Sequence, residues 1–170
     1  IGFVVMLFNT EFLWKVTPFL YILGLGLMVL PIVFYNPSLV ASTGAKNWVS
    51  VNGITLFQPS EFMKISYILM LARVIVQFTK KHKEWRRTVP LDFLLIFWMI
   101  LFTIPVLVLL ALQSDLGTAL VFVAIFSGIV LLSGVSWKII IPVFVTAVTG
   151  IAGFLAIFIS KDGRAFLHQL

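Results

Sequence analysis

The residues best suited to chemistry lie in a polar run within an apolar stretch, Gln58-Pro59-Ser60-Glu61-Phe62-Met63-Lys64. Glu61 and Lys64 are three residues apart, so in a helix their side chains share one face. A charged group at the centre of a membrane helix costs about 2.5–3.5 kcal/mol on insertion scales. Such charged residues in a membrane helix are therefore expected to form a structural ion pair or to act on a polar substrate.

Both interpretations of this pair stay open. In the simpler one, Glu61 and Lys64 neutralise each other so that the helix can insert, which says little about function. In the other, they line a polar cavity that opens to the outer side and holds an anionic or hydroxylated substrate. Lys64 would supply positive charge, as lysine does for phosphates, and Glu61 would orient Lys64 or a water molecule. Gln58 and Ser60 add polar groups on the same turn, which favours the cavity.

Two further candidate residues stand in separate motifs. Asp115, in Gln113-Ser114-Asp115-Leu116-Gly117-Thr118, precedes an apolar run and so occupies the position of a helix N-cap. Its carboxylate could also face the site of Lys64. Trp48 closes the motif Gly44-Ala45-Lys46-Asn47-Trp48. It is typical of an aromatic belt at the membrane interface, and it could also cap the cavity or stack on a sugar ring.

The elements that position these residues are expected to be transmembrane helices. The chain is 61% hydrophobic and 11% charged, whereas soluble domains are about 25% charged. A span needs about 20 mostly apolar residues, and Pro18, Pro59 and Pro90 stand near expected helix starts, where the missing N–H costs little. We predict an all-α polytopic bundle, a single transmembrane domain over residues 1–170, with the end of an earlier span and five complete ones at residues 16–35, 59–78, 91–112, 116–132 and 139–159.

The charges of the loops predict the orientation of these helices. Residues 79–90 hold five Lys or Arg and one Glu, so the positive-inside rule places this loop in the cytoplasm. Alternation then places residues 36–57, 113–115 and 160–170 outside. The four candidates Trp48, Glu61, Lys64 and Asp115 thereby fall in the outer half of the membrane.

Composition also excludes several classes of function. The chain has no cysteine, and its two histidines, His82 and His168, are far apart, so we expect no metal site built by the protein. Ser60 has no neighbouring histidine to activate it, which disfavours a serine hydrolase. The net charge of +6 reflects cytoplasmic loops beside anionic lipid rather than nucleic-acid binding.

The three motifs, in this order and across essentially the whole chain, resemble the RodA/FtsW/SpoVE (SEDS) family. The Gln-Pro-Ser-Glu-Phe-x-Lys run is the most specific of them, and Lys46-Asn47-Trp48 is closer to the RodA, elongation-type branch. The family usually has Pro where this chain has Ser114. The resemblance implies an internal fragment of a roughly ten-helix protein, from the end of its second helix through its seventh and into a large external loop.

The resemblance also implies a function in cell-wall synthesis and cell shape. Such proteins are peptidoglycan glycosyltransferases that polymerise lipid II at the outer face of the bacterial cytoplasmic membrane, beside a class B penicillin-binding protein. Lys64 would face the pyrophosphate, Glu61 and Asp115 would shape the site, and a divalent cation could share the charge. The family's favoured catalytic aspartate lies beyond Leu170, so no general base is assigned, and residues 1–170 alone are expected to be inactive.

Two other functions remain open at this point. A flippase or transporter of lipid-linked precursors would also place polar groups near one side of kinked helices. A non-catalytic membrane scaffold for cell-wall synthesis is the third possibility. An aspartate in the later external loop would favour the enzyme.

Overall fold

The computed structural model describes residues 10–35, 37, 40–41, 44–51, 54–82 and 89–137, together with residues 139, 141, 142, 145 and 149. This part of the chain forms the helices α2 (Thr10–Val33), α4 (Pro59–Lys81), α5 (Val89–Leu112) and α6 (Leu116–Leu132). The prediction of an all-α membrane bundle is confirmed for the helical body. It missed a short antiparallel hairpin between α2 and α4, made of β1 (Val49–Val51) and β2 (Ile54–Phe57).

The prediction of five complete spans is wrong for the described residues. Three helices are long and apolar enough to cross a membrane, at Phe12–Val33, Pro59–Lys81 and Pro90–Leu112. The 17 residues of α6 extend about 26 Å at 1.5 Å per residue, which is less than the roughly 30 Å hydrocarbon layer. The predicted span at residues 139–159 lies mostly outside the described residues.

The first span also begins earlier than predicted. Its helix starts at Thr10, so Pro18 lies inside α2 rather than near its start, and Pro31 lies inside it too. Membrane helices tolerate internal proline because neighbouring groups can satisfy the carbonyl that proline frees. Proline is therefore a weaker boundary signal here than in a soluble protein.

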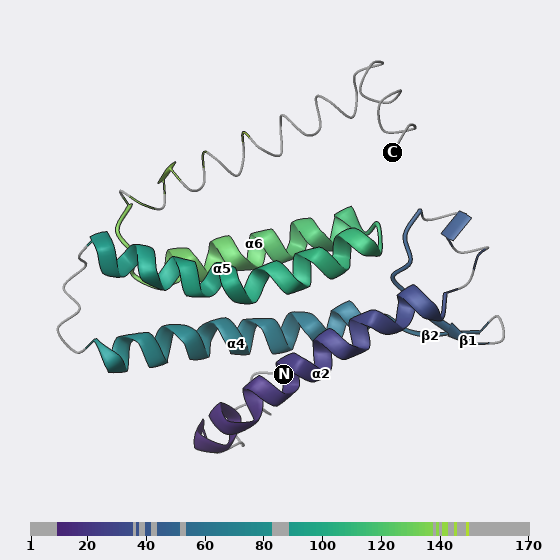
Figure 1. The fold of residues 1–170 in the computed structure, drawn as a ribbon, viewed down its shortest axis with the longest axis horizontal. Coiled ribbons are helices and arrows are strands. Elements are labelled where there is room, and N and C mark those ends of the chain that lie inside the picture. The colour runs from purple at the N-terminus through teal and green to yellow at the C-terminus, as the bar shows by residue number, and fades with distance from the viewer. Residues whose placement is uncertain are drawn as a thin grey trace.

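The helices are arranged so that one end of the bundle carries the hairpin. Figure 1 shows α4, α5 and α6 running side by side, while α2 crosses α4 close to β1 and β2. The crossing is tight at Gly24, where an added Cβ would lie 2.6 Å from Met63 Sδ. Met63 is fully buried, so glycine at position 24 permits the close approach of α2 to α4.

This contact predicts a difference between two glycines of the same helix. We expect Gly24→Ala to destabilise the protein relative to Gly26→Ala by about 1–3 kcal/mol, the usual cost of overpacking. The control is matched because nothing lies within 4 Å of a Cβ at Gly26. Thermal unfolding of both variants in detergent measures the difference, and equal midpoints would contradict the tight crossing.

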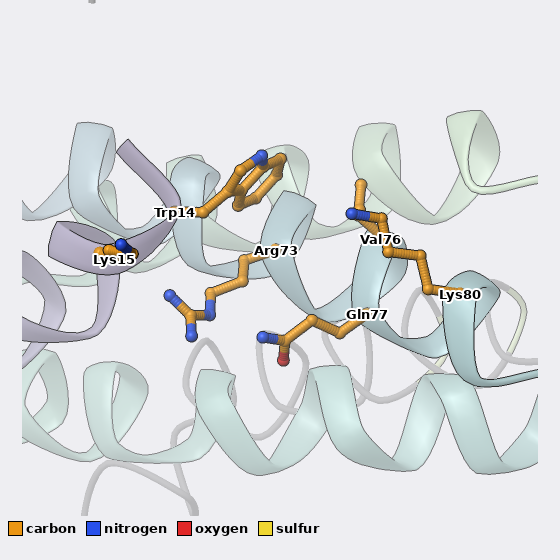
Figure 2. A pocket seen from close by; sticks show the side chains of 6 residues that line it. All are labelled: Trp14, Lys15, Arg73, Val76, Gln77 and Lys80. Atoms are coloured by element: carbon orange, nitrogen blue, oxygen red, sulfur yellow. The ribbon is translucent and has the colours of Figure 1, made fainter. Parts of the chain in front are cut away.

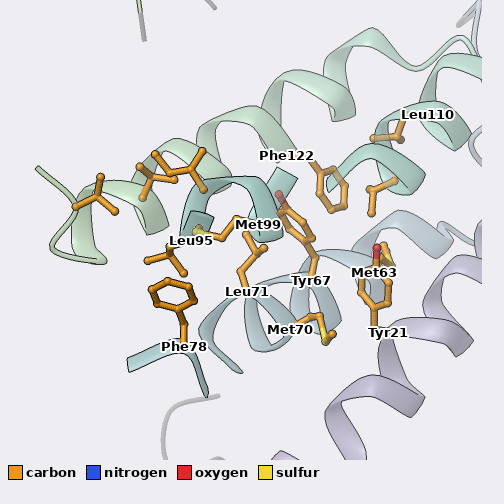
Figure 3. Close-up of a cluster of buried hydrophobic side chains, with 14 of the residues drawn as sticks. Tyr21, Met63, Tyr67, Met70, Leu71, Phe78, Leu95, Met99, Leu110 and Phe122 are labelled. Carbon is orange, nitrogen blue, oxygen red and sulfur yellow. The ribbon is translucent and has the colours of Figure 1, made fainter. Parts of the chain in front are cut away.

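The hydrophobic core lies between α2, α4, α5 and α6 and is shown in Figure 3. Tyr67 is at its centre, fully buried, with its ring edge-on to Phe122 at 5.2 Å between centroids. The Tyr67 hydroxyl is 2.8 Å from Thr103 Oγ1, which itself donates to the Met99 carbonyl at 2.8 Å. A buried hydroxyl needs such a partner because an unsatisfied one is costly, so this chain of bonds connects α4 to α5 within the apolar interior.

Asp92 connects the start of α5 to the segment after α6. It lies in the first turn of α5, and it is completely buried. Its Oδ2 accepts a hydrogen bond from the Ser136 backbone N–H at 2.9 Å. Burying a carboxylate requires such partners, so this contact fixes the two segments to each other.

The orientation of the bundle in the membrane stays a prediction, and labelling can test it. Because the chain has no cysteine, single cysteines can be introduced at positions 43 and 83. We expect a membrane-impermeant thiol reagent applied to intact cells to label position 43 and spare position 83. The opposite pattern would reverse the assigned topology.

Candidate functional site

Asp115 lies in the turn between α5 and α6 and caps α6, as its sequence position predicts. Its Oδ1 accepts a hydrogen bond from the Thr118 backbone N–H at 2.9 Å, and its Oδ2 accepts one from Thr118 Oγ1 at 2.7 Å. Ser114, just before it, adopts a left-handed conformation with φ of 57°, which reverses the chain. Asp115 as a whole is 7% exposed, so these bonds hold a largely buried side chain.

The same carboxylate joins the Gly44–Trp48 motif to the turn. Asn47 Nδ2 donates to Asp115 Oδ2 at 2.7 Å, and the Lys46 backbone N–H donates to the Gln113 carbonyl at 2.8 Å. The buried Gln113 side chain donates to the Met28 carbonyl of α2 at 2.6 Å. We call the group Asn47, Gln113, Asp115 and Thr118 the Asp115 junction.

Lys46 and Trp48, the two other notable residues of the Gly44–Trp48 motif, have surroundings that do not indicate one specific function. Lys46 places its ammonium 4.7 Å from the centroid of the Tyr35 ring, which is a cation–π contact. Trp48, immediately before β1, is 38% exposed. An exposed indole beside the hairpin is compatible with both predicted roles, an interface anchor and a stacking surface for a sugar.

Glu61 and Lys64 form the ion pair that their spacing predicts. Lys64 Nζ lies 2.8 Å from Glu61 Oε1, with the Glu61 side chain 63% exposed and that of Lys64 25% exposed. Glu61 is in the first turn of α4, where the helix dipole favours a negative charge. The pair is therefore on the surface of the described chain and open to a further partner.

The remaining predicted residues flank this pair. Gln58 follows β2 and occupies the N-cap of α4 without a side-chain cap bond, and Pro59 begins the helix. Ser60 is buried, and its Oγ has no hydrogen-bond partner among the described residues; the same is true of Asn47 Oδ1. These atoms leave hydrogen-bonding capacity at the hairpin end of the bundle.

The described residues bring these elements to one end of the bundle. Figure 1 shows the hairpin, the start of α4 and the turn between α5 and α6 at the same end of the bundle. Two cavities run along the C-terminal half of α4, and neither is lined by Glu61, Lys64 or Asp115. Within the described ranges, no group of three or more His, Asp or Glu is placed to hold a metal ion.

Sequence reasoning missed the partners of Asp115. Asn47 and Gln113 belong to two of the three motifs, and Thr118 follows the cap by three residues. None of the three was predicted to be a site residue. The position of the cap does indicate Thr118, because an N-cap side chain accepts a hydrogen bond from the backbone N–H two or three residues further along the chain. No local signal connects Asn47 with a residue 68 positions away.

A family model described as a cell cycle protein family, FtsW/RodA/SpoVE, matches residues 1–167. The chain belongs to the FtsW/RodA/SpoVE family. With its candidate spans, it is a multi-pass protein of the bacterial cytoplasmic membrane, as predicted.

Curated relatives bear the names of two members of the family. A probable peptidoglycan glycosyltransferase FtsW of Borreliella burgdorferi is 28% identical over 85% of this chain and 37% of its own length. The peptidoglycan glycosyltransferase MrdB of Escherichia coli K12 is 33% identical over 85% of this chain and 35% of its own length. This chain therefore spans little more than a third of these relatives.

Two solved structures share the fold. The rod shape-determining protein RodA of Thermus thermophilus, crystallised as an aspartate-to-alanine mutant, is 26% identical with a TM-score of 0.59, over 86% of this chain and 45% of that one. A chain from a peptidoglycan synthase complex that coordinates polymerization and crosslinking has a TM-score of 0.67 at 23% identity, over 97% and 45% of the two chains. The second likeness concerns the fold alone.

Proposed function

We propose that this chain is part of a peptidoglycan glycosyltransferase that polymerises lipid II at the outer face of the bacterial cytoplasmic membrane. The observation that carries the proposal is the Asp115 junction, which ties two of the three family motifs together at the end of the bundle where the third begins. The names of the curated relatives support the reaction.

Lys64, Glu61 and Asp115 are proposed to have different roles in this reaction. Glycosyl transfer from lipid II requires a base for the attacking hydroxyl and positive charge for the pyrophosphate leaving group. Lys64 is the proposed cation, and Glu61 positions it through their 2.8 Å contact. The Asp115 carboxylate already accepts three hydrogen bonds, so we propose that it positions the outer loop and is not the base.

The other predicted residues would complete the outer surface around the substrate. Trp48 offers an exposed indole for a sugar ring, while Gln58 and Ser60 offer polar groups beside the pair. We propose no base among the described residues and keep the prediction that it lies beyond residue 170. A divalent cation, where one takes part, would neutralise pyrophosphate charge together with Lys64.

The proposed partner is a class B penicillin-binding protein that crosslinks the new strands. The similar fold of a chain in a peptidoglycan synthase complex supports a partner of this kind. We further propose the elongation branch, supported by the Lys46-Asn47-Trp48 motif and the likeness to RodA. Restoration of rod shape, but not of division, in depleted cells tests that assignment.

Polymerisation of purified lipid II by the complete protein tests the activity. We expect glycan strands to form, and to form faster when the partner is present. Strand length on a gel, with a transpeptidase inhibitor added, separates polymerisation from crosslinking. Lipid II moved across vesicles without polymer would favour a flippase, and neither activity would favour a scaffold.

A further inference from the structure

A cationic cavity lies between α2 and the C-terminal half of α4 (Figure 2). Its volume is about 280 Å³, and it is lined by Trp14, Lys15, Arg73, Val76, Gln77 and Lys80. Three of these six residues are cations and none is acidic. From Glu61 to Lys80 the helix rises roughly 28 Å at 1.5 Å per residue, so this cavity is separate from the proposed polymerisation site.

Arg73 presents an unused hydrogen-bond donor at this cavity. With the Gln77 amide turned so that its oxygen faces Arg73, the guanidinium Nε and Nη2 donate to that oxygen at 3.1 and 3.2 Å. The third nitrogen, Nη1, is buried and has no partner among the described residues. A buried, unpaired donor is costly, and the cost is larger for a charged group, so this arrangement favours an incoming anion.

The charge at the cavity comes from side chains and not from the helix end. The C-terminus of α4 carries a partial negative charge, which would repel an anion, yet Lys80 lies in its last turn. Across the cavity, Trp14 and Lys15 come from α2, and tryptophan is enriched at membrane interfaces. Glu11, one turn before Lys15, has a side chain outside the described residues.

We propose that the cationic cavity binds a phosphate group at the membrane boundary, carried by an anionic lipid or by a soluble phosphate ester. Arg73 Nη1 donates to the phosphate, and Lys15 and Lys80 balance its charge. Gln77 orients the guanidinium, and the Trp14 indole covers the apolar side. Clusters of lysine and arginine beside membrane helices recognise anionic headgroups in this way.

Native mass spectrometry of the complete protein in detergent tests the proposal, with phosphatidylglycerol and phosphatidylcholine as probes. We expect tighter binding of phosphatidylglycerol. Arg73→Gln and Lys80→Gln should each weaken it by about fivefold, the loss expected for one cation beside an anionic surface. Lys80→Gln leaves the contact between Arg73 and Gln77 in place, so this variant still tests the proposal if Arg73→Gln does not fold.

The matched control is Lys81→Gln, the next residue of α4, which does not line this cavity. It should bind phosphatidylglycerol as the wild type does. Equal affinity of the wild type for both lipids, or an equal loss in Lys81→Gln, would overturn the proposal. Displacement of phosphatidylglycerol by glycerol phosphate would support a soluble ester as the source, and its retention would support the lipid.

Discussion

Replacing Lys64 by methionine is expected to abolish lipid II polymerisation even when Glu61 is replaced by glutamine in the same protein. The reason is that Lys64 is proposed to act on the pyrophosphate or on the catalytic aspartate, and Glu61 cannot supply a positive charge. Loss of one electrostatic group aimed at a transition state costs about 100- to 1,000-fold in rate. We therefore expect at least about a 100-fold loss in both Lys64→Met and the double variant.

The double variant separates this role from a purely mutual ion pair. If Glu61 and Lys64 only neutralise each other, removing both restores what removing one costs, because no stranded charge remains. Polymerisation must therefore be measured together with membrane abundance for both single variants and the double. Lys81→Met, an exposed lysine at the far end of the same helix, is the matched control and should retain activity. A well-expressed double variant with near-normal polymerisation would leave the pair a structural role only.

Asp115→Ala is expected to destabilise the complete protein by about 2–4 kcal/mol. Loss of a helix N-cap costs about 1 kcal/mol, and a stranded buried donor, here Asn47 Nδ2, costs about 1–3 kcal/mol more. Thermal unfolding in detergent, monitored by intrinsic fluorescence, measures the change. Because Asn is itself a good N-cap, Asp115→Asn should recover only the cap contribution of about 1 kcal/mol, since its amide NH2 cannot accept the bond that Oδ2 takes from Asn47.

A double-mutant cycle with Asn47→Ala isolates the contact between the loop and the turn. We expect the two changes together to cost less than the sum of their separate effects, because each alone already breaks the 2.7 Å bond. Strict additivity would show that the Gly44–Trp48 motif and the α5–α6 turn are not energetically coupled. A loss within about 0.5 kcal/mol for Asp115→Ala, the range of ordinary surface changes, would contradict the junction itself.

Local sequence signals predicted the parts of this site that depend on neighbours in the chain. The cap at Asp115 and the pair of Glu61 with Lys64 involve residues three positions apart, and both are present. The hairpin was also readable, because Asn52-Gly53 between two short runs of alternating polarity is a strong hairpin signal. The high hydrophobicity of the chain favours an all-helical interpretation, which masks this local signal.

The features that escaped prediction depend on distant segments. Nothing near Gly24 indicates that Met63 will pack against it, and nothing near Asp92 indicates that Ser136 will donate to it. Span boundaries failed for a related reason, since internal proline in α2 is tolerated only where surrounding groups satisfy the backbone. Such information lies in the packing of the bundle and not in the periodicity of one segment.

Two buried aspartates connect the α5–α6 pair to neighbouring segments, one at each end of the pair. At one end Asp115 fixes the turn that joins the helices, and at the other Asp92 holds the segment after α6 through Ser136. The 24 residues of α5 extend about 36 Å, enough to reach from one membrane surface to the other. Because the two helices are joined at both ends, a displacement of the α5–α6 turn is expected to reach the segment after α6, and Pro105 is the point at which α5 can bend.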